Sequence, residues 1–122
     1  MSDTHLSFKE MCAKFGVTAR TLRYYEYIEL LSPEREGRSR YYGPREVARM
    51  TLTMRARRFG FSLEEVRQWL KMYDDEGPAT QMRVMVEMSD IQLAKLTEQI
   101  DELCAAHDEL KQLRDMVAKN LK

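Results

Sequence analysis

The sequence predicts a mainly α-helical (all-α) fold, with a winged helix-turn-helix head, a small β-ribbon wing and a long C-terminal coiled-coil helix. Three observations support this prediction. Two short amphipathic segments flank a tight glycine turn, an arginine-rich β-type segment follows them, and no Gly or Pro occurs after Pro78. The 122 residues fit one small domain with an appended element, because compact domains usually contain about 100 to 150 residues.

The first helix is expected to begin after Ser7 and to end at Gly16. Ser7 and Glu10 have the spacing of a capping box, in which each side chain accepts a hydrogen bond from an unpaired backbone N–H. After the glycine turn, Thr18 is a suitable N-cap for a second short helix that reaches about Ile28. Two short helices joined in this way predict a helix-turn-helix unit.

The second helix has two chemically different faces. Leu22 and Tyr25 share the face that should pack against the first helix. The opposite face carries hydrogen-bond donors and an aromatic ring, supplied by Arg20, Thr21, Arg23 and Tyr24. Arginine can donate a forked pair of hydrogen bonds to guanine, and Thr and Tyr hydroxyls can reach phosphates. This second face therefore favours DNA binding.

Residues 34–42 predict a β-ribbon with Gly37 at its tip. Its basic residues are Arg35, Arg38 and Arg40. Because side chains alternate along a strand, one of Tyr41 and Tyr42 should pack inward and the other can lie against a DNA backbone. A ribbon of this kind after a helix-turn-helix unit is typical of a wing.

Two further helices should follow the ribbon. Pro44 suits the first position of a helix that ends before Gly60. Its mostly apolar stripe consists of Val47, Met50, Thr51 and Met54. Ser62 and Glu65 form a second capping box, and apolar residues then recur at helical spacing as far as Tyr73.

The charge is distributed unevenly, although the net charge is zero. Residues 1–72 contain 14 Lys and Arg against 9 Asp and Glu, whereas residues 73–122 contain 6 against 11. Every basic residue between positions 18 and 58 is an arginine. This pattern fits either a nucleic-acid-facing head or a solvated surface. Two interpretations are likewise open for Arg55, Arg57 and Arg58. They form either a second wing that binds phosphate or a solvated helix end.

The residues after Pro78 predict one long helix that pairs with a second copy. Alternating steps of three and four residues from Val86 give eleven positions, of which eight are apolar. The exceptions are Ser89, His107 and Arg114. Dimer contacts are expected from Val86, Leu93, Leu96, Ile100, Leu103, Leu110 and Val117. A helix about 60 Å long cannot bury such a stripe alone, so a two-fold homodimer is expected.

These patterns divide the chain into three segments. We expect the DNA-binding head over residues 1–73, an acidic hinge over residues 74–78 and the dimerisation helix over residues 79–122. The hinge is suggested by three consecutive acidic residues followed by Gly77 and Pro78.

Several other classes of protein are not expected. Cys12 and Cys104 do not make a disulfide framework, and neither a membrane-spanning run nor a signal-peptide pattern occurs, so we expect a cytoplasmic protein without membrane contact. We also expect no enzyme, catalytic residue, cofactor or metal. No nucleophile–base pair or phosphate-binding glycine loop is visible, and His5 lies in a terminus expected to be mobile.

A resemblance to a known family rests on residues 18–26 (TARTLRYYE), 30–33 (LLSP) and 57–66 (RRFGFSLEEV). In order and spacing these segments resemble the MerR family of bacterial regulators. The resemblance implies a homodimer whose antiparallel helices place two heads on a palindromic promoter operator, where RNA polymerase also binds. Family members bend and untwist promoters with over-long spacers, and an effector changes that distortion.

The resemblance also implies which residues contact DNA. On the recognition helix in the major groove these are Thr18, Arg20, Thr21, Arg23 and Tyr24. On the first wing they are Arg38, Arg40 and Tyr41, and on the second wing Arg58.

The sequence departs from the metal-sensing members of the family. Those members carry a cysteine near the start of the dimerisation helix, whereas residues 78–81 read PATQ here. We therefore expect no mercury, copper or zinc sensor. Cys104 is expected to be a packed or surface thiol rather than a ligand, and His107 a polar residue that fixes the register of the coil rather than a protonation switch.

Residues 33–42 and 69–76 resemble small members that regulate branched-chain amino-acid and fatty-acid breakdown. This resemblance implies an acyl-coenzyme A or related metabolite as effector, held at the junction of head and coil. The alternative is an architectural or excisionase-like DNA-bending protein, which shares the head but needs no effector. A structural coiled-coil adaptor would leave the arginine face of the second helix unused.

Overall fold

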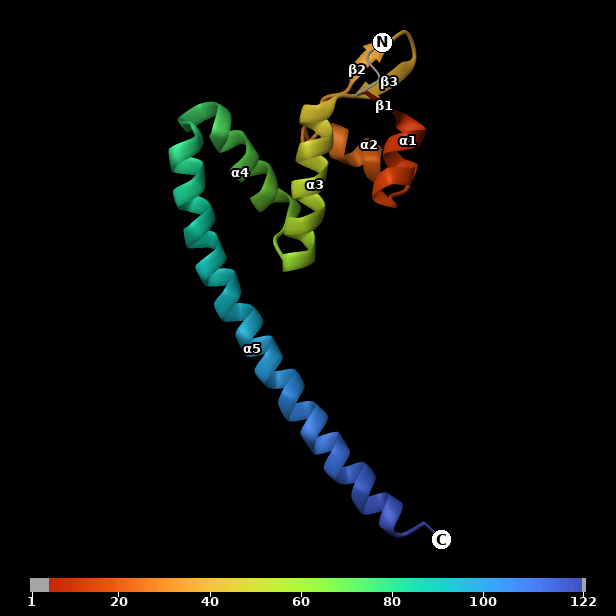
Figure 1. Cartoon of the computed structure of the whole chain (residues 1–122), viewed down its shortest axis with the longest axis vertical. Helices are drawn as coiled ribbons and strands as arrows, with labels where there is room; N and C mark the ends of the chain where they lie inside the picture. The colour runs from red at the N-terminus through yellow and green to blue at the C-terminus, as the bar shows by residue number, and fades with distance from the viewer. Residues whose placement is uncertain (1–4, 122) are drawn as a thin grey trace. The chain divides into compact units, whose positions relative to one another are not determined.

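The computed structural model describes residues 5–121 and divides into two compact units, one up to Val84 and one from Met85 onward. The first unit contains β1 (Leu6–Ser7), α1 (Phe8–Phe15), α2 (Ala19–Tyr27), β2 (Glu34–Glu36), β3 (Ser39–Tyr42), α3 (Pro44–Phe59) and α4 (Leu63–Glu76) (Figure 1). Helix α5 (Pro78–Lys119) begins in the first unit and forms the second. The predicted fold class, mainly helical with a small antiparallel sheet, is confirmed.

The helix ends lie where local chemistry predicts them. Both capping boxes are formed, since Ser7 and Glu10 at α1, and Ser62 and Glu65 at α4, exchange reciprocal side-chain to backbone hydrogen bonds. The hydrogen bond from the Ser7 backbone N–H to the Glu10 carboxylate lowers the pKa of that carboxyl. Pro44 occupies the first turn of α3, as expected.

The wing is part of a three-stranded antiparallel sheet with the order β1-β3-β2. Strand β1 was not expected, because two residues are too few to show an alternating pattern; Leu6 pairs with Tyr42 and Ser7 with Tyr41. The predicted alternation of the two tyrosines is confirmed, because Tyr42 is fully buried and Tyr41 is half-buried. The sheet thus attaches the wing to the start of α1.

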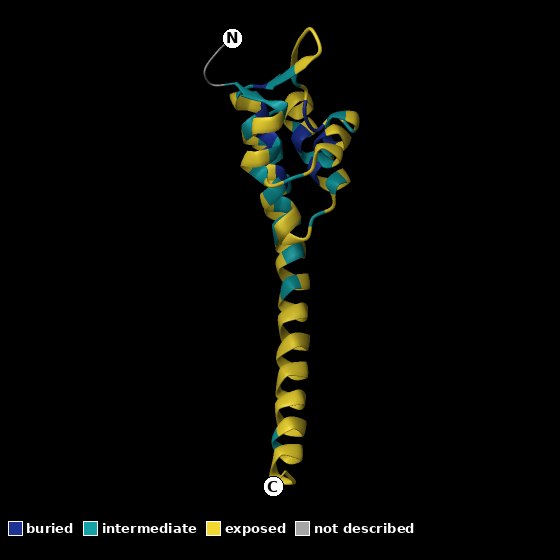
Figure 2. Ribbon diagram, turned by 90° about the vertical axis from the view of Figure 1, so that its right-hand side faces the viewer, coloured by how far each residue is buried: buried dark blue, intermediate teal, exposed yellow. Residues whose placement is uncertain are grey.

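The hydrophobic core of the head lies between α1, α2, β3, α3 and α4 (Figure 2). Its buried members are Met11, Leu22, Tyr25, Leu30, Leu31, Tyr42, Met50, Val66 and Leu70. Leu22 and Tyr25 lie on the inner face of α2, as predicted. By contrast, no residue of α5 is buried (Figure 2).

The predicted stripe of α3 is wrong at one position. Thr51 is exposed, whereas Thr53 is buried. Both hydroxyls donate to the carbonyl four residues earlier, at 2.9 Å from Thr51 to Val47 and at 2.8 Å from Thr53 to Arg49. A helical threonine can satisfy its own hydroxyl in this way, so polarity alone does not tell which threonine is buried.

The three acidic residues expected in a hinge form the last turn of α4, which continues through Glu76. The helical stretch breaks at Gly77, whose φ is 86°. Acidic side chains do not themselves end a helix, whereas a positive φ does. The connection between α4 and α5 is therefore a single glycine.

The chain leaves α2 through Glu29, two residues after the end of the helix, which has a positive φ of 66° although it is not a glycine. The Leu30 N–H donates to the Tyr25 carbonyl at 2.9 Å and the Glu29 N–H donates to the Glu26 carbonyl at 3.0 Å, which together form a Schellman motif. The left-handed conformation costs a residue with a Cβ about 1 to 2 kcal/mol. The buried contacts of Leu30 and Tyr25 offset this strain.

Replacing Glu29 by glycine should raise the free energy of unfolding by about 0.5 to 1 kcal/mol, because glycine adopts this φ without strain but loses more backbone entropy. Helices α1 and α3 already end with glycine, at Gly16 and Gly60. Urea denaturation at fixed protein concentration measures the change. Glu29→Ala is the control, since it removes the charge and keeps the strain; an equal gain from both variants would contradict the role of backbone strain.

Candidate nucleic-acid interface

The N-terminus of α2 is organised by two of the threonines predicted to contact DNA. The Thr18 side chain accepts from the Thr21 N–H at 3.1 Å, and the Thr18 hydroxyl donates to the Thr21 hydroxyl at 3.0 Å. This arrangement leaves the Thr21 hydroxyl proton available to an external acceptor. The first turn of α2 also has unpaired backbone N–H groups, so it suits contact with an anion.

The outward face of α2 carries the predicted recognition residues. Arg20, Arg23 and Tyr24 are exposed, with Tyr24 at 51%. Leu22 and Tyr25 lie on the opposite face in the core. The core thus fixes which face of the helix is available, and that face presents two guanidinium groups and a phenol.

The wing carries a second basic area. Arg35 and Arg38 flank Gly37, whose φ of 62° forms the turn between β2 and β3, and both arginines are exposed. The next predicted wing residue, Arg40, is different because its side chain is only 26% exposed. Tyr41 is half-buried, so part of its ring lies at the surface of the sheet.

Glu26 joins α2 to the wing. Its Oε1 forms an ion pair with Arg40 Nε at 3.1 Å, without the direction of a hydrogen bond, and its Oε2 accepts from the Tyr42 hydroxyl. The Arg40 guanidinium also lies over the Phe8 ring, 5.4 Å from its centroid. Burial raises the pKa of the Tyr42 phenol, and the Glu26 carboxylate raises it further, so Tyr42 remains a neutral donor.

The turn after α2 is held from two other helices. Arg49 of α3 donates from Nε to the Leu30 carbonyl at 2.8 Å, and Arg67 of α4 donates from Nε to the Ile28 carbonyl at 2.9 Å. Burial lowers the pKa of Arg49, and the neighbouring Arg45 lowers it further. The sequence analysis missed both contacts, because 19 and 39 residues separate the partners. No local signal in the sequence could have indicated them.

The third predicted DNA-binding position is at the C-terminal end of α3. Arg57 and Arg58 lie in the last turn of α3 and are exposed, as is Arg55 one turn earlier. Gly60 then reverses the chain into the short connection to α4. These arginines stand on a helix end rather than on a β-ribbon.

The arginines of the head fall into two groups. Four of them bond to other residues of the chain, namely Arg40, Arg45, Arg49 and Arg67. Within the described residues, no hydrogen bond or ion pair engages Arg20, Arg23, Arg35, Arg38, Arg55, Arg57 or Arg58. An unpaired guanidinium has all of its N–H donors available for phosphate or guanine.

His5, which was expected to lie in a mobile terminus, contacts the wing in the structure. Its Nε2 lies 3.2 Å from Glu34 Oε2, and a Cβ added at Gly43 would lie 3.1 Å from the same nitrogen. The exposed Glu34 belongs to β2, so His5 attaches the N-terminal segment to the wing. Gly43 therefore leaves room for the imidazole ring.

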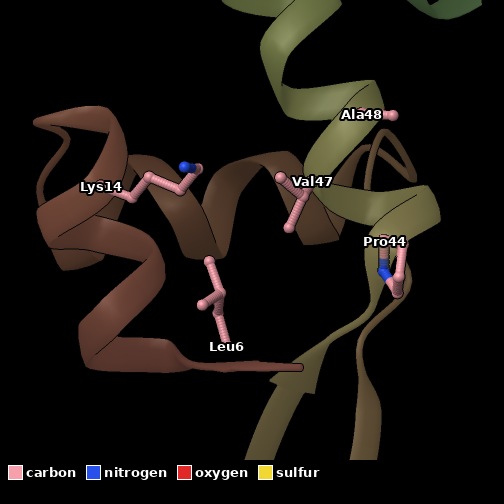
Figure 3. A pocket seen from close by; sticks show the side chains of 5 residues that line it. All are labelled: Leu6, Lys14, Pro44, Val47 and Ala48. Carbon is pink, nitrogen blue, oxygen red and sulfur yellow. The ribbon is translucent and has the colours of Figure 1, made fainter. Parts of the chain in front are cut away.

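A shallow pocket lies between α1, β1 and the start of α3 (Figure 3). It is lined by Leu6, Lys14, Pro44, Val47 and Ala48. Figure 3 shows Leu6 and Val47 projecting into the space between these elements. The lining is mainly apolar, and Lys14 is the one ionisable residue among these five.

Two capped short helices, a three-stranded wing and unpaired arginines on the outer face of α2 define a winged helix-turn-helix DNA-binding protein. Two family models match the chain: "MerR HTH family regulatory protein" over residues 6–78 and "MerR, DNA binding" over residues 47–113. The chain belongs to the MerR family and is a DNA-binding transcription regulator of the MerR type. Its relatives are transcription regulators and not enzymes.

Individual relatives agree with this assignment. The chain is 37% identical over 94 residues to the HTH-type transcriptional regulator HmrR of Rhizobium leguminosarum bv. viciae, covering 76% of this chain and 69% of HmrR. A putative MerR family transcriptional regulator from Listeria monocytogenes is 32% identical, with a TM-score of 0.69 over 87% of this chain and 80% of that protein. HiNmlR, a MerR family regulator lacking the sensor domain and solved bound to promoter DNA, shares the fold at 22% identity, with a TM-score of 0.69 over 85% and 79% of the two chains.

Residues 5–121 contain neither a membrane-spanning helix nor a cluster of metal-binding side chains. Over residues 5–121, no helix combines the length and apolar character needed to cross a membrane. Over the same part of the chain, no three His, Cys, Asp or Glu side chains gather as they would around a metal ion.

Arg40→Ala should lower the free energy of unfolding by about 1 to 3 kcal/mol, because it leaves the mostly buried Glu26 carboxylate without its counter-charge. Arg38→Ala is the matched control, since the Arg38 side chain is exposed and unpaired in the described chain. It should leave stability unchanged and weaken DNA binding. Urea denaturation and DNA titration of both variants measure this. An Arg40→Ala protein of unchanged stability would contradict the structural role of the ion pair.

Proposed function

We propose that the protein is a homodimer that binds a palindromic promoter operator, distorts this DNA and responds to a small metabolite. The observation that carries the proposal is the outer face of α2, where Arg20, Arg23 and Tyr24 are exposed and unpaired within the described chain. Guanidinium groups on the exposed face of a helix can read guanine in the major groove. The positive charge at the wing tip and at the end of α3 supports binding of flanking phosphates.

The proposed roles follow the geometry of each side chain. Arg20 and Arg23 read base edges, while Tyr24 and the two threonines at the start of α2 bind the backbone. On the wing, Arg38 contacts phosphate and Tyr41 lies against a sugar. Arg40 supports the wing through Glu26 and reaches DNA only with its terminal nitrogens. Arg58 and its neighbours contact phosphate from the end of α3.

Dimerisation is proposed from the exposed stripe of α5. The exposed fractions are 60% for Val86, 58% for Leu93, 58% for Ile100, 71% for Leu103, 66% for Leu110 and 52% for Val117, and Leu96 is half-buried. Side chains of this size cost free energy in water, and a second copy can cover them. A two-fold axis would then present two heads to a palindrome. His107 and Cys104 are exposed on the same helix, where His107 Nδ1 pairs with Asp108 at 3.1 Å.

Control by an effector is the second part of the proposal. We propose an acyl-coenzyme A or related metabolite, action together with RNA polymerase at the promoter, and a cytoplasmic location. The head would comprise residues 1–73 and the dimerisation helix residues 79–122. Binding of the purified protein to its own upstream DNA, with and without acyl-coenzyme A at fixed salt, tests this. Tight binding that no ligand changes would favour an architectural DNA-bending protein instead.

Arg20→Ala and Arg23→Ala should each cost about 1 to 3 kcal/mol on the operator and relax the preference at one base position, because a bidentate base contact is lost. Arg58→Ala should weaken operator and random DNA alike and reduce the salt slope by about one, because a phosphate contact carries no sequence information. The operator is obtained by selection from a randomised duplex library. Equal losses on operator and random DNA for the α2 variants would contradict base reading.

Leu103→Glu should weaken dimerisation by at least about 3 kcal/mol, or roughly two orders of magnitude, since each copy loses a buried leucine and gains a charge in the contact. Sedimentation equilibrium measures the dissociation constant. Gln112→Glu is the matched control, because it adds the same charge at an exposed position of α5 outside the stripe. Two variants that dimerise equally well would contradict the proposed contact surface.

A further inference from the structure

We propose that Tyr27 is a further DNA contact, in which its hydroxyl donates to a backbone phosphate at the C-terminal end of the recognition helix. This inference rests on the proposed function of α2 and extends its contact surface by one turn. Tyr27 is the last residue of α2 and was not among the residues expected to bind DNA. Tyr27 is 83% exposed, more than any other large hydrophobic residue among residues 5–121.

The position of Tyr27 on the helix places it in the middle of the outer face. It follows Arg20 by seven residues, Arg23 by four and Tyr24 by three, which are the spacings of neighbours on one side of a helix. The buried residues Leu22 and Tyr25 precede it by five and two residues and lie on the other side. These four outward side chains therefore form one continuous strip, with a phenol at its end.

The surroundings of Tyr27 favour an anionic acceptor. The C-terminus of a helix normally repels phosphate, because its last carbonyls are unpaired and partially negative. Here the Ile28 carbonyl accepts from Arg67 at 2.9 Å and the Leu30 carbonyl accepts from Arg49 at 2.8 Å. Two guanidinium groups thus offset the negative potential beside Tyr27. Its own hydroxyl has no partner among the described residues.

The chemistry of tyrosine fits a backbone contact better than a base contact. The phenol donates one hydrogen bond at the end of a rigid ring with only two side-chain torsions, so little conformational entropy is lost on binding. A single donor cannot form the bidentate pattern by which arginine or asparagine distinguishes bases. The ring also supplies an apolar face that can lie against deoxyribose.

The test compares Tyr27→Phe with wild type in the full-length dimer. Affinities are measured by fluorescence anisotropy on the selected operator and on a random duplex, over a range of salt concentrations, and hydroxyl-radical footprints are recorded on the operator. Tyr73→Phe is the control, because Tyr73 is also exposed, at 53%, but lies on α4 outside the strip. Urea denaturation checks that both variants keep the stability of the wild type.

We expect Tyr27→Phe to bind both DNAs about tenfold more weakly, with an unchanged salt slope, since a neutral hydroxyl releases no counterion. One backbone position in each half-site should lose protection, and Tyr73→Phe should bind as wild type does. Unchanged affinity, or a loss confined to the operator, would overturn the phosphate contact. Failure of the proposed function would give a different result. In that case the wild type would show no preference for the operator, and Arg20→Ala would leave the affinity for DNA unchanged.

Discussion

The position of α2 relative to the wing depends on the contacts of one side chain, the carboxylate of Glu26. It lies on α2 and binds two residues of the wing, Arg40 and Tyr42. A mostly buried carboxylate is stable only when its charge is balanced and its oxygens accept hydrogen bonds, and β3 provides both. These two contacts therefore hold α2 and β3 in a fixed position relative to each other in the structure.

The turn that follows α2 is also held by charged side chains bonded to partners distant in the sequence. After α2 the chain turns at Glu29 in a strained left-handed conformation, and arginines of α3 and α4 hold the carbonyls of this turn. Arg67, which makes one of these contacts, lies two residues before Trp69. The Trp69 ring N–H donates to the Gln81 carbonyl at 3.0 Å, and the Gln81 amide donates back to the Trp69 carbonyl at 3.1 Å. Helix α4 thus makes polar contacts both with the end of α2, through Arg67, and with the first turn of α5, through Trp69.

Much of the fold followed from local signals. The capping boxes, the N-cap threonine and the glycine stops at Gly16 and Gly60 placed the helix ends correctly, because these signals act within four residues. The alternation in the ribbon predicted which tyrosine would be buried. Local reasoning failed where polarity was ambiguous, as for Thr53, and where an element was too short for any pattern, as for β1. It also assigned a hinge to acidic residues that remain helical.

The sequence by itself determined the class of fold, the outward face of α2 and the unsatisfied stripe of α5, since periodicity and capping are properties of neighbouring residues. Only the tertiary structure decided which arginines are available to DNA. In the sequence Arg38 and Arg40 look alike, but folding pairs Arg40 with Glu26 and leaves Arg38 exposed. Arg67 is likewise committed to a carbonyl 39 residues away. The sequence shows how many arginines the chain has. Which of them are free to bind DNA depends on the partners that folding brings to each guanidinium from distant parts of the chain.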